Sequence, residues 1–260
     1  MAAYLFAVFV FLLSIALAVV GLVLAQRWVP LELRQAHNTT LGILYGTLHV
    51  TFGVMVGFSA FLVLNKYSAT QHAVADEAGD VVQIYQMAEG FPEPPRDRIR
   101  ELAKSYARVV VDEEWPLMGE GRPSSRAEAL APELRRPIQG FEPTTEAERA
   151  LHARMLERVD EMNENREIRL LNSREGLPRI LWGVLVLLAG IIISFTFFLG
   201  MESARLHRFA VATLAGAIAL IMFTIVALDN PFGGLFGVGP DAFELVQDAI
   251  EESEENQGAS

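Results

Sequence analysis

Four apolar runs, each long enough to cross a bilayer, occur in two pairs along the chain. None contains Asp, Glu, Lys or Arg, and they cover residues 4–25, 41–64, 180–199 and 209–228. A helix of about 20 apolar residues, at about 1.5 Å per residue, spans the roughly 30 Å hydrocarbon core of a membrane. The pattern predicts an all-α membrane protein with four transmembrane helices arranged as two hairpins.

The polar stretch between the two pairs has a helical pattern with prolines at its joints. The second membrane helix can continue without a break to residue 87, and further helices are expected at 96–114 and 145–173, with a short one around 126–130. Thr145 and Glu148 are spaced as a capping box that opens the last long helix. The chain is therefore predicted to contain a first transmembrane hairpin (1–66), a soluble helical insert (67–178), a second transmembrane hairpin (179–234) and an acidic, disordered tail (235–260).

The acidic residues are concentrated at the end of the chain. The formal net charge is −11, and residues 241–255 hold seven Asp or Glu without any Lys or Arg. We expect an amphipathic segment over 243–250 that leads into the disordered tail. The alternative is an acidic ring that oligomerisation gathers at a pore mouth. A mixed-charge insert and an acidic tail give no support to nucleic-acid binding, and the absence of Cys excludes disulfides.

The basic residues near the apolar runs do not determine which way the protein is oriented in the membrane. Four crossings put the amino terminus, the insert and the tail on one side. The short connections carry Arg27, Arg34, Arg205 and Arg208, and the insert side carries a similar number of basic residues. The positive-inside rule therefore does not choose a side. The first run could also be a cleaved signal peptide ending near Ala18, but its length and the lack of a preceding basic residue favour a membrane helix.

The second apolar run combines small residues with a strip of larger ones. One arc holds Gly42, Gly46, Gly53 and Gly57, and such small residues let another helix approach closely. The strip beside it, at three-to-four spacing, consists of Tyr45, His49, Phe52 and Val56. This strip is a candidate lining for an ion path. The alternative is ordinary helix packing, in which a neutral His49 bonds to a neighbouring helix.

Two sets of charged residues outside the apolar runs are also candidates. Glu77 and Arg174 lie at similar distances from the membrane on antiparallel helices, so they could form a structural ion pair or a charged vestibule that selects ions. Glu113 and Glu114 end a helix, where the dipole opposes negative charge. They therefore need partners such as arginines, or else a divalent cation.

The sequence resembles the bestrophin-like family of bacterial and plant membrane proteins of unassigned function, which is distantly similar to bestrophin anion channels. The residues that carry the resemblance are His37-Asn38, Leu44-Tyr45-Gly46, Gly57-Phe58, Tyr67, Asp76-Glu77-Ala78, Glu113 to Pro116, Ser173-Arg174, Leu177-Pro178, Leu181-Trp182 and Leu228 to Gly234. The family positions taken from it are Glu114, Trp115, Asp229, Pro231 and Phe232. Asn230 departs from the basic residue that the resemblance implies there.

The resemblance implies an oligomeric, channel-like membrane protein. Bestrophins themselves are pentameric anion channels whose second helix lines the pore and whose helical domain is cytosolic. By that analogy we expect a homo-oligomer in the cell membrane, with small inorganic ions as ligands and with the insert and tail in the cytoplasm.

Enzymatic motifs and metal-ligand sets are lacking in the sequence, so we expect no catalysis, no cofactor and no metal. His72 with Asp76, and Glu148 with His152, are helical pairs without a third ligand nearby. Two functions stay open: an ion channel lined by the second helix, or a noncatalytic scaffold or sensor whose helical stalk binds partners.

Overall fold

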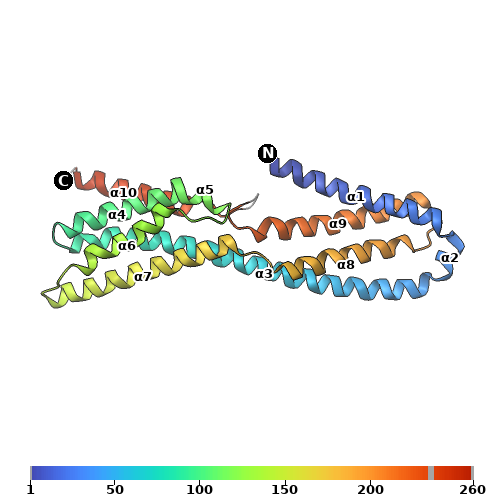
Figure 1. The fold of residues 1–260 in the computed structure, drawn as a ribbon, viewed down its shortest axis with the longest axis horizontal. Coiled ribbons are helices and arrows are strands. Elements are labelled where there is room, and N and C mark those ends of the chain that lie inside the picture. The colour runs from blue at the N-terminus through green and yellow to red at the C-terminus, as the bar shows by residue number, and fades with distance from the viewer. Residues whose placement is uncertain (1, 234–236, 259–260) are drawn as a thin grey trace. The chain divides into compact units, whose positions relative to one another are not determined.

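The computed structural model describes residues 2–233 and 237–258. These residues form helices and the connections between them, without a strand among them (Figure 1). The chain divides into two compact units. We call Met1–Asn65 with Leu177–Asp229 the membrane unit, and Lys66–Gly176 with Asn230–Ser260 the insert unit.

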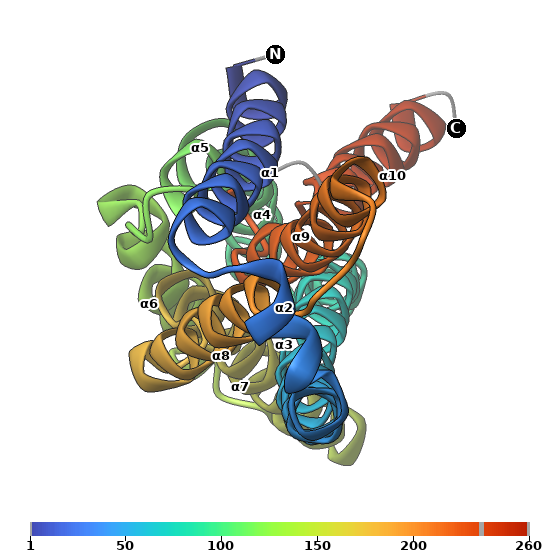
Figure 2. The same ribbon diagram turned by 90° about the vertical axis from the view of Figure 1, so that its right-hand side faces the viewer.

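The membrane unit is built from four long apolar helices, each able to cross a bilayer, which confirms the fold class predicted from the sequence. Its elements are α1 (Ala2–Trp28), the short α2 (Leu31–Ala36), the first part of α3 (Asn38–Met87), α8 (Arg179–Phe197) and α9 (Ala204–Asp229). The helices lie side by side, and Figure 2 views them from the α2 end. Many outward side chains are apolar and exposed, as lipid contact requires.

Close packing inside the membrane unit joins α1 to α9, and α3 to α9 and to the segment before α8. Leu22 of α1 packs with Val211 and Ala215 of α9 in one buried cluster. Leu177 and Ile225 form another cluster with a buried residue of α3, Val63. Because lipid offers apolar side chains no hydrophobic gain from association, such van der Waals contact holds the helices together.

The insert unit is an all-helical domain with its own core. The second part of α3 reaches Met87 without a break, as predicted, and a 3₁₀ turn follows at Ala88–Gly90. The remaining elements are α4 (Pro95–Val109), a π-helical segment (Val110–Glu114), α5 (Trp115–Met118), α6 (Ser125–Gln139), α7 (Glu146–Arg174) and α10 (Asp241–Gly258). The predicted capping box opens α7, since Thr145 accepts from Glu148 N and the Glu148 carboxylate accepts from Thr145 N.

Helix α6 is longer than the short helix expected around residues 126–130. Ser124 caps it by accepting from Arg126 N and Ala127 N. Ala131, Leu134 and Ile138 are buried in the core of the insert unit. This apolar stripe extends the helix through Pro132 and Pro137, although proline removes a backbone donor at each position.

The acidic end of the chain also differs from the expected disordered tail. Helix α10 covers Asp241–Gly258, and its Phe243, Val246 and Ile250 are buried against the core of the insert unit. Gln247 Nε2 donates to Ala107 O of α4 at 3.3 Å. Apolar residues at three-to-four spacing thus hold an otherwise acidic helix on the domain.

Candidate functional site

Helix α3 has one face buried within the membrane unit. Phe52 is 6% exposed and shares a cluster with Leu185 and Ala189 of α8 and Ile218 of α9. Ser59 and Val63, further along the same face, are also buried. This face of α3 packs against α8 and α9 within the chain.

The predicted pore strip lies on that buried side. Tyr45 and Val56 are half-buried and pack against the Phe52 cluster. His49 Nδ1 lies 2.9 Å from the Tyr45 carbonyl oxygen of its own helix, and its ring meets Tyr45 edge-on at 4.0 Å. Because Phe52 is covered by α8 and α9, the pore-lining role of the strip stays a prediction that would require those contacts to open.

The opposite side of α3 is open. Ideal Cβ atoms built at Gly42, Gly46, Gly53 and Gly57 would each meet no atom within 4 Å. Large apolar side chains continue this open surface, and they include Ile43, Val50, Val54 and Phe61 at 69%, 68%, 65% and 61% exposure. At about 100° per residue these four side chains share an arc about half a turn from Phe52.

Hydroxyl groups also occur on the open side of α3. Thr47 and Thr51 are exposed, and each hydroxyl donates to the carbonyl four residues earlier, at 3.2 and 3.1 Å. Their donors are satisfied within the helix while the oxygens can still accept a bond. The open face of α3 therefore combines small, apolar and weakly polar groups.

At the α2 end of the membrane unit, polar contacts join the helices. Asn38 Nδ2 donates to Gly200 O at 3.0 Å, and Gly200 N donates back to Asn38 Oδ1 at 2.8 Å. A Cβ on Gly200 would lie 2.6 Å from Gln35 N, so only glycine allows this close backbone approach.

A buried histidine adds a second polar contact at the α2 end. His207 Nε2 lies 2.8 Å from Thr196 O of α8, and His207 Nδ1 lies 3.4 Å from Gln26 Nε2 of α1. A carbonyl only accepts, so Nε2 carries the proton and Nδ1 accepts from the amide. His207 thus connects three helices as a neutral side chain.

The insert unit contains a fully buried charge cluster centred on Arg169 of α7. Arg169 Nε donates to Glu77 Oε2 at 2.6 Å, and Nη2 donates to Glu77 Oε1 and Glu114 Oε2, both at 2.8 Å. All three side chains are 0% exposed. The guanidinium also lies over the rings of Trp115 and Phe243, at 5.6 and 5.9 Å from their centres.

Further partners complete this cluster. Arg166 Nη2 donates to Glu114 Oε1 at 2.6 Å, and Tyr106 OH donates to Glu77 Oε1 at 2.6 Å. Burial alone would lower the pKa of Arg169, but the charges of Glu77 and Glu114 outweigh it and raise the pKa above its usual value. Burial, and then the charge of Glu77, raise the pKa of Tyr106 well above its usual value. The cluster thus pairs the two acidic side chains, Glu77 and Glu114, with the two guanidinium groups of Arg166 and Arg169.

The structure does not bring Glu77 and Arg174 together, which corrects the ion pair expected from the sequence. Glu77 pairs with Arg169, five residues earlier on α7, and Arg174 Nε donates to Gly121 O at 3.2 Å. The two carboxylates of the π-helical segment after α4 have arginine partners, and Glu113 pairs with Arg126 at 2.9 Å. The π-helical segment carries Glu114 into the core, where Arg169 and Arg166 bind it.

The positions taken from the family resemblance lie in both units. Asp229 accepts from Leu177 N at 2.7 Å and from Trp182 Nε1 at 3.4 Å within the membrane unit. In the insert unit, Phe232 packs edge-on against Trp115 at 5.6 Å, and Pro231 O accepts from Val238 N at 2.6 Å.

Asn230 stabilises the turn that follows α9. Asn230 Oδ1 accepts from Phe232 N and Gly233 N, at 3.3 and 3.0 Å. An amide therefore shapes the turn where a basic residue was expected. Gly234, the last residue of this motif, lies outside the described residues.

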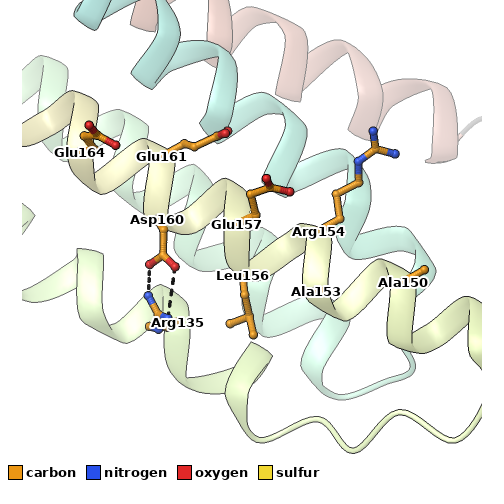
Figure 3. Close-up of a pocket in the computed structure, with 9 residues that line it drawn as sticks. All are labelled: Arg135, Ala150, Ala153, Arg154, Leu156, Glu157, Asp160, Glu161 and Glu164. Atoms are coloured by element: carbon orange, nitrogen blue, oxygen red, sulfur yellow. Dashed lines mark hydrogen bonds and ion pairs between the residues drawn. The ribbon is translucent and has the colours of Figure 1, made fainter.

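A shallow groove with mostly charged walls runs along α7 (Figure 3). Asp160 points toward Arg135 of α6 and pairs with it, whereas Glu157, Glu161 and Glu164 project from other sides of α7. Within residues 2–233 and 237–258 there is no group of three or more acidic or histidine side chains that could hold a metal ion.

The sequence matches the bestrophin-like domain over residues 12–243, and this match covers most of the chain. The chain belongs to the bestrophin-like family. Comparison with curated proteins gave no match.

Solved structures agree with this assignment at the level of the fold. A bacterial bestrophin homologue from Klebsiella pneumoniae aligns with a TM-score of 0.69 and 11% identity, covering 95% of this chain and 98% of that chain. A second structure of a Klebsiella pneumoniae bestrophin homologue gives 0.70 and 10%, over 94% and 97% of the two chains. A structure described only as a membrane protein gives 0.71 and 10%, over 95% and 97%. This bestrophin-like chain is thus similar in fold to those proteins over nearly its whole length.

Proposed function

We propose that this chain is the subunit of a homo-oligomeric ion channel in the cell membrane, and that the open face of α3 lines the ion path. The observation that carries the proposal is the uncovered surface of α3, where four glycines have free space above them beside Ile43, Val50, Val54 and Phe61. In lipid, small residues favour close packing with another helix. Copies of α3 packed through their glycines would turn the adjacent apolar strip toward a common axis.

The pore lining that we propose is the face of α3 opposite Phe52, in place of the Phe52 side expected from the sequence. Phe52 is buried against α8 and α9, whereas Val50 and Val54 are mostly exposed. A ring of valine side chains forms a narrow apolar constriction that resists wetting and can act as a gate. Thr47 and Thr51 beside it offer hydroxyl oxygens to water or ions. The proposed role is conduction without catalysis.

Charge at the short connections supports anions as the conducted ions. These connections hold Arg27, Arg34, Arg205 and Arg208 against two acidic residues, Glu32 and Glu202. An excess of positive charge at a pore mouth raises the local concentration of anions. The proposal therefore predicts greater permeability to chloride than to sodium or potassium.

Replacing Val54 by threonine is expected to raise the ion flux. Threonine keeps the shape of valine but adds a hydroxyl that favours wetting of an apolar constriction. The measurement is chloride current through purified protein in planar bilayers. The matched control is Val226→Thr, because Val226 on α9 is similarly exposed in the subunit at 53% but lies outside the proposed path. Equal currents for wild type and Val54→Thr, or an equal rise in both variants, would exclude this lining.

The proposed orientation places the insert unit in the cytoplasm. The chain has no native Cys, so single cysteines report the side on which they lie. A cysteine at Ser125, which is exposed at the start of α6, is expected to resist a membrane-impermeant thiol reagent in intact cells. A cysteine at Glu202, which is exposed between α8 and α9, should react before lysis. The opposite labelling pattern would invert the orientation.

A further inference from the structure

Arg34 is a buried cation in the short connection between α1 and α3. It lies on the six-residue helix α2 and is 7% exposed. Its Nε and Nη1 atoms are both buried, and neither has a hydrogen-bond partner among the described residues. The guanidinium therefore has donors that the subunit does not satisfy.

No carboxylate of the described membrane unit neutralises Arg34. The acidic residues of the two short connections are Glu32 and Glu202, and both are exposed. Among the described residues, neither carboxylate accepts a hydrogen bond from Arg34 Nε or Nη1. The nearby histidine is also occupied, since His207 binds Thr196 and Gln26 through its two ring nitrogens.

The covering of Arg34 is built into the fold. Gly200 lies so close to α2 that a Cβ would meet Arg34 C at 2.9 Å, and Asn38 fixes Gly200 through two hydrogen bonds. The backbone of α2 at Arg34 is thus held against Gly200 by specific contacts. The position of α2, which carries the buried Arg34, is therefore fixed relative to the connection between α8 and α9.

An arginine stays charged at all physiological pH values, and burying a charge without a partner is strongly unfavourable. We propose that Arg34 binds an anion, which supplies the missing acceptors. The site lies between α1, which ends at Trp28, and α3, which begins at Asn38, so it is near the membrane–water boundary. At this depth the ligand is either the phosphate of a phospholipid headgroup or a small free anion such as chloride. The proposal does not depend on conduction.

Thermal unfolding of the purified, delipidated protein in a maltoside detergent tests this site. In one arm sodium chloride replaces sodium gluconate at constant ionic strength. In the other arm phosphatidylglycerol is compared with a phosphate-free glycolipid. A ligand present at 100 times its dissociation constant lowers the unfolding equilibrium constant about 100-fold. Wild type is expected to gain thermal stability in at least one arm, and native mass spectrometry should show retained phospholipid if the lipid arm responds.

Variants locate the effect at Arg34. Arg34→Gln is expected to lose the response, whereas Arg27→Gln, which removes an exposed arginine from the same end of the unit, should keep it. Arg34→Lys keeps the charge without the planar fork and should respond only at higher ligand concentration. This variant decides the question if Arg34→Gln does not fold. A wild type insensitive to both chloride and phospholipid, or variants at position 34 that respond at the same concentrations as wild type, would overturn the proposal.

Discussion

Replacing Arg169 by methionine is expected to unfold the insert unit under conditions in which the wild type stays folded. The substitution preserves much of the side-chain volume but leaves Glu77 and Glu114 buried without their shared guanidinium. Removing one partner of a buried ion pair costs about 3–5 kcal/mol, and here two carboxylates lose the same partner. Since a domain is stable by only about 5–15 kcal/mol, the loss is a large fraction of the total. Thermal unfolding followed by circular dichroism measures it.

Two further variants separate charge burial from general damage to the helices. Arg98→Met removes an arginine of α4 whose side chain is 51% exposed and which pairs with Glu101 at 2.9 Å. An exposed pair of this kind contributes at most about 1 kcal/mol, so this variant should unfold near the wild-type temperature. Adding Glu77→Gln to Arg169→Met removes the uncompensated carboxylate and leaves Glu114 paired with Arg166, so this double variant should recover much of the stability. If Arg169→Met unfolds at the same temperature as Arg98→Met, the cluster does not hold the insert unit together.

Replacing both Gly53 and Gly57 by leucine is expected to disrupt assembly while leaving the subunit folded. Neither glycine has an atom within 4 Å of its ideal Cβ, so the leucines meet no obstacle inside the subunit. Leucine is also a better helix former than glycine. Between two copies of α3, however, the added side chains prevent close backbone approach. We expect the dissociation constant of the oligomer to rise at least about tenfold, which corresponds to about 1.4 kcal/mol.

The matched control is Ala217→Leu, which adds a large apolar side chain at an exposed small residue of α9, outside the proposed contact between subunits. Native mass spectrometry gives the oligomer mass, and circular dichroism gives the helix content of each variant. An unchanged oligomer in the Gly53→Leu/Gly57→Leu variant would show that this face of α3 is not a contact between subunits.

The membrane architecture could be predicted from the sequence because charge-free runs of about 20 residues have few alternatives in a bilayer. The unbroken α3 and the capping box of α7 were likewise visible as local patterns. The full lengths of α6 and α10 could not be predicted from the sequence. Prolines in α6 and acidic residues in α10 are typical of turns and disordered tails, and they mask the apolar stripe of each helix. Their extent depends on burial against the insert core, which no local pattern displays.

The side-chain partners were harder to predict than the helices. Arg169 follows Met155, Val159 and Met162 at helical spacing, so its position in an otherwise apolar stripe was the signal for a buried charge. Pairing Glu77 with Arg174 by distance from the membrane failed because only Arg169 lies on the buried face of α7. The sequence could not show that α8 and α9 cover Phe52, because periodicity identifies the face of a helix but not what packs against that face. The π-helical turn at Glu114 gives no recognisable sequence signal.

Ion flux through purified wild-type protein in sealed liposomes, with the oligomeric mass determined on the same preparation, distinguishes a channel from a membrane-anchored scaffold. We expect an oligomer that makes the liposomes permeable to chloride, with a larger flux in the Val54→Thr variant. The contradicting result is that both proteins are folded and oligomeric and yet leave the liposomes sealed to chloride, sodium and potassium. The helical insert would then be the working part of the molecule, as a scaffold or sensor anchored by the membrane unit.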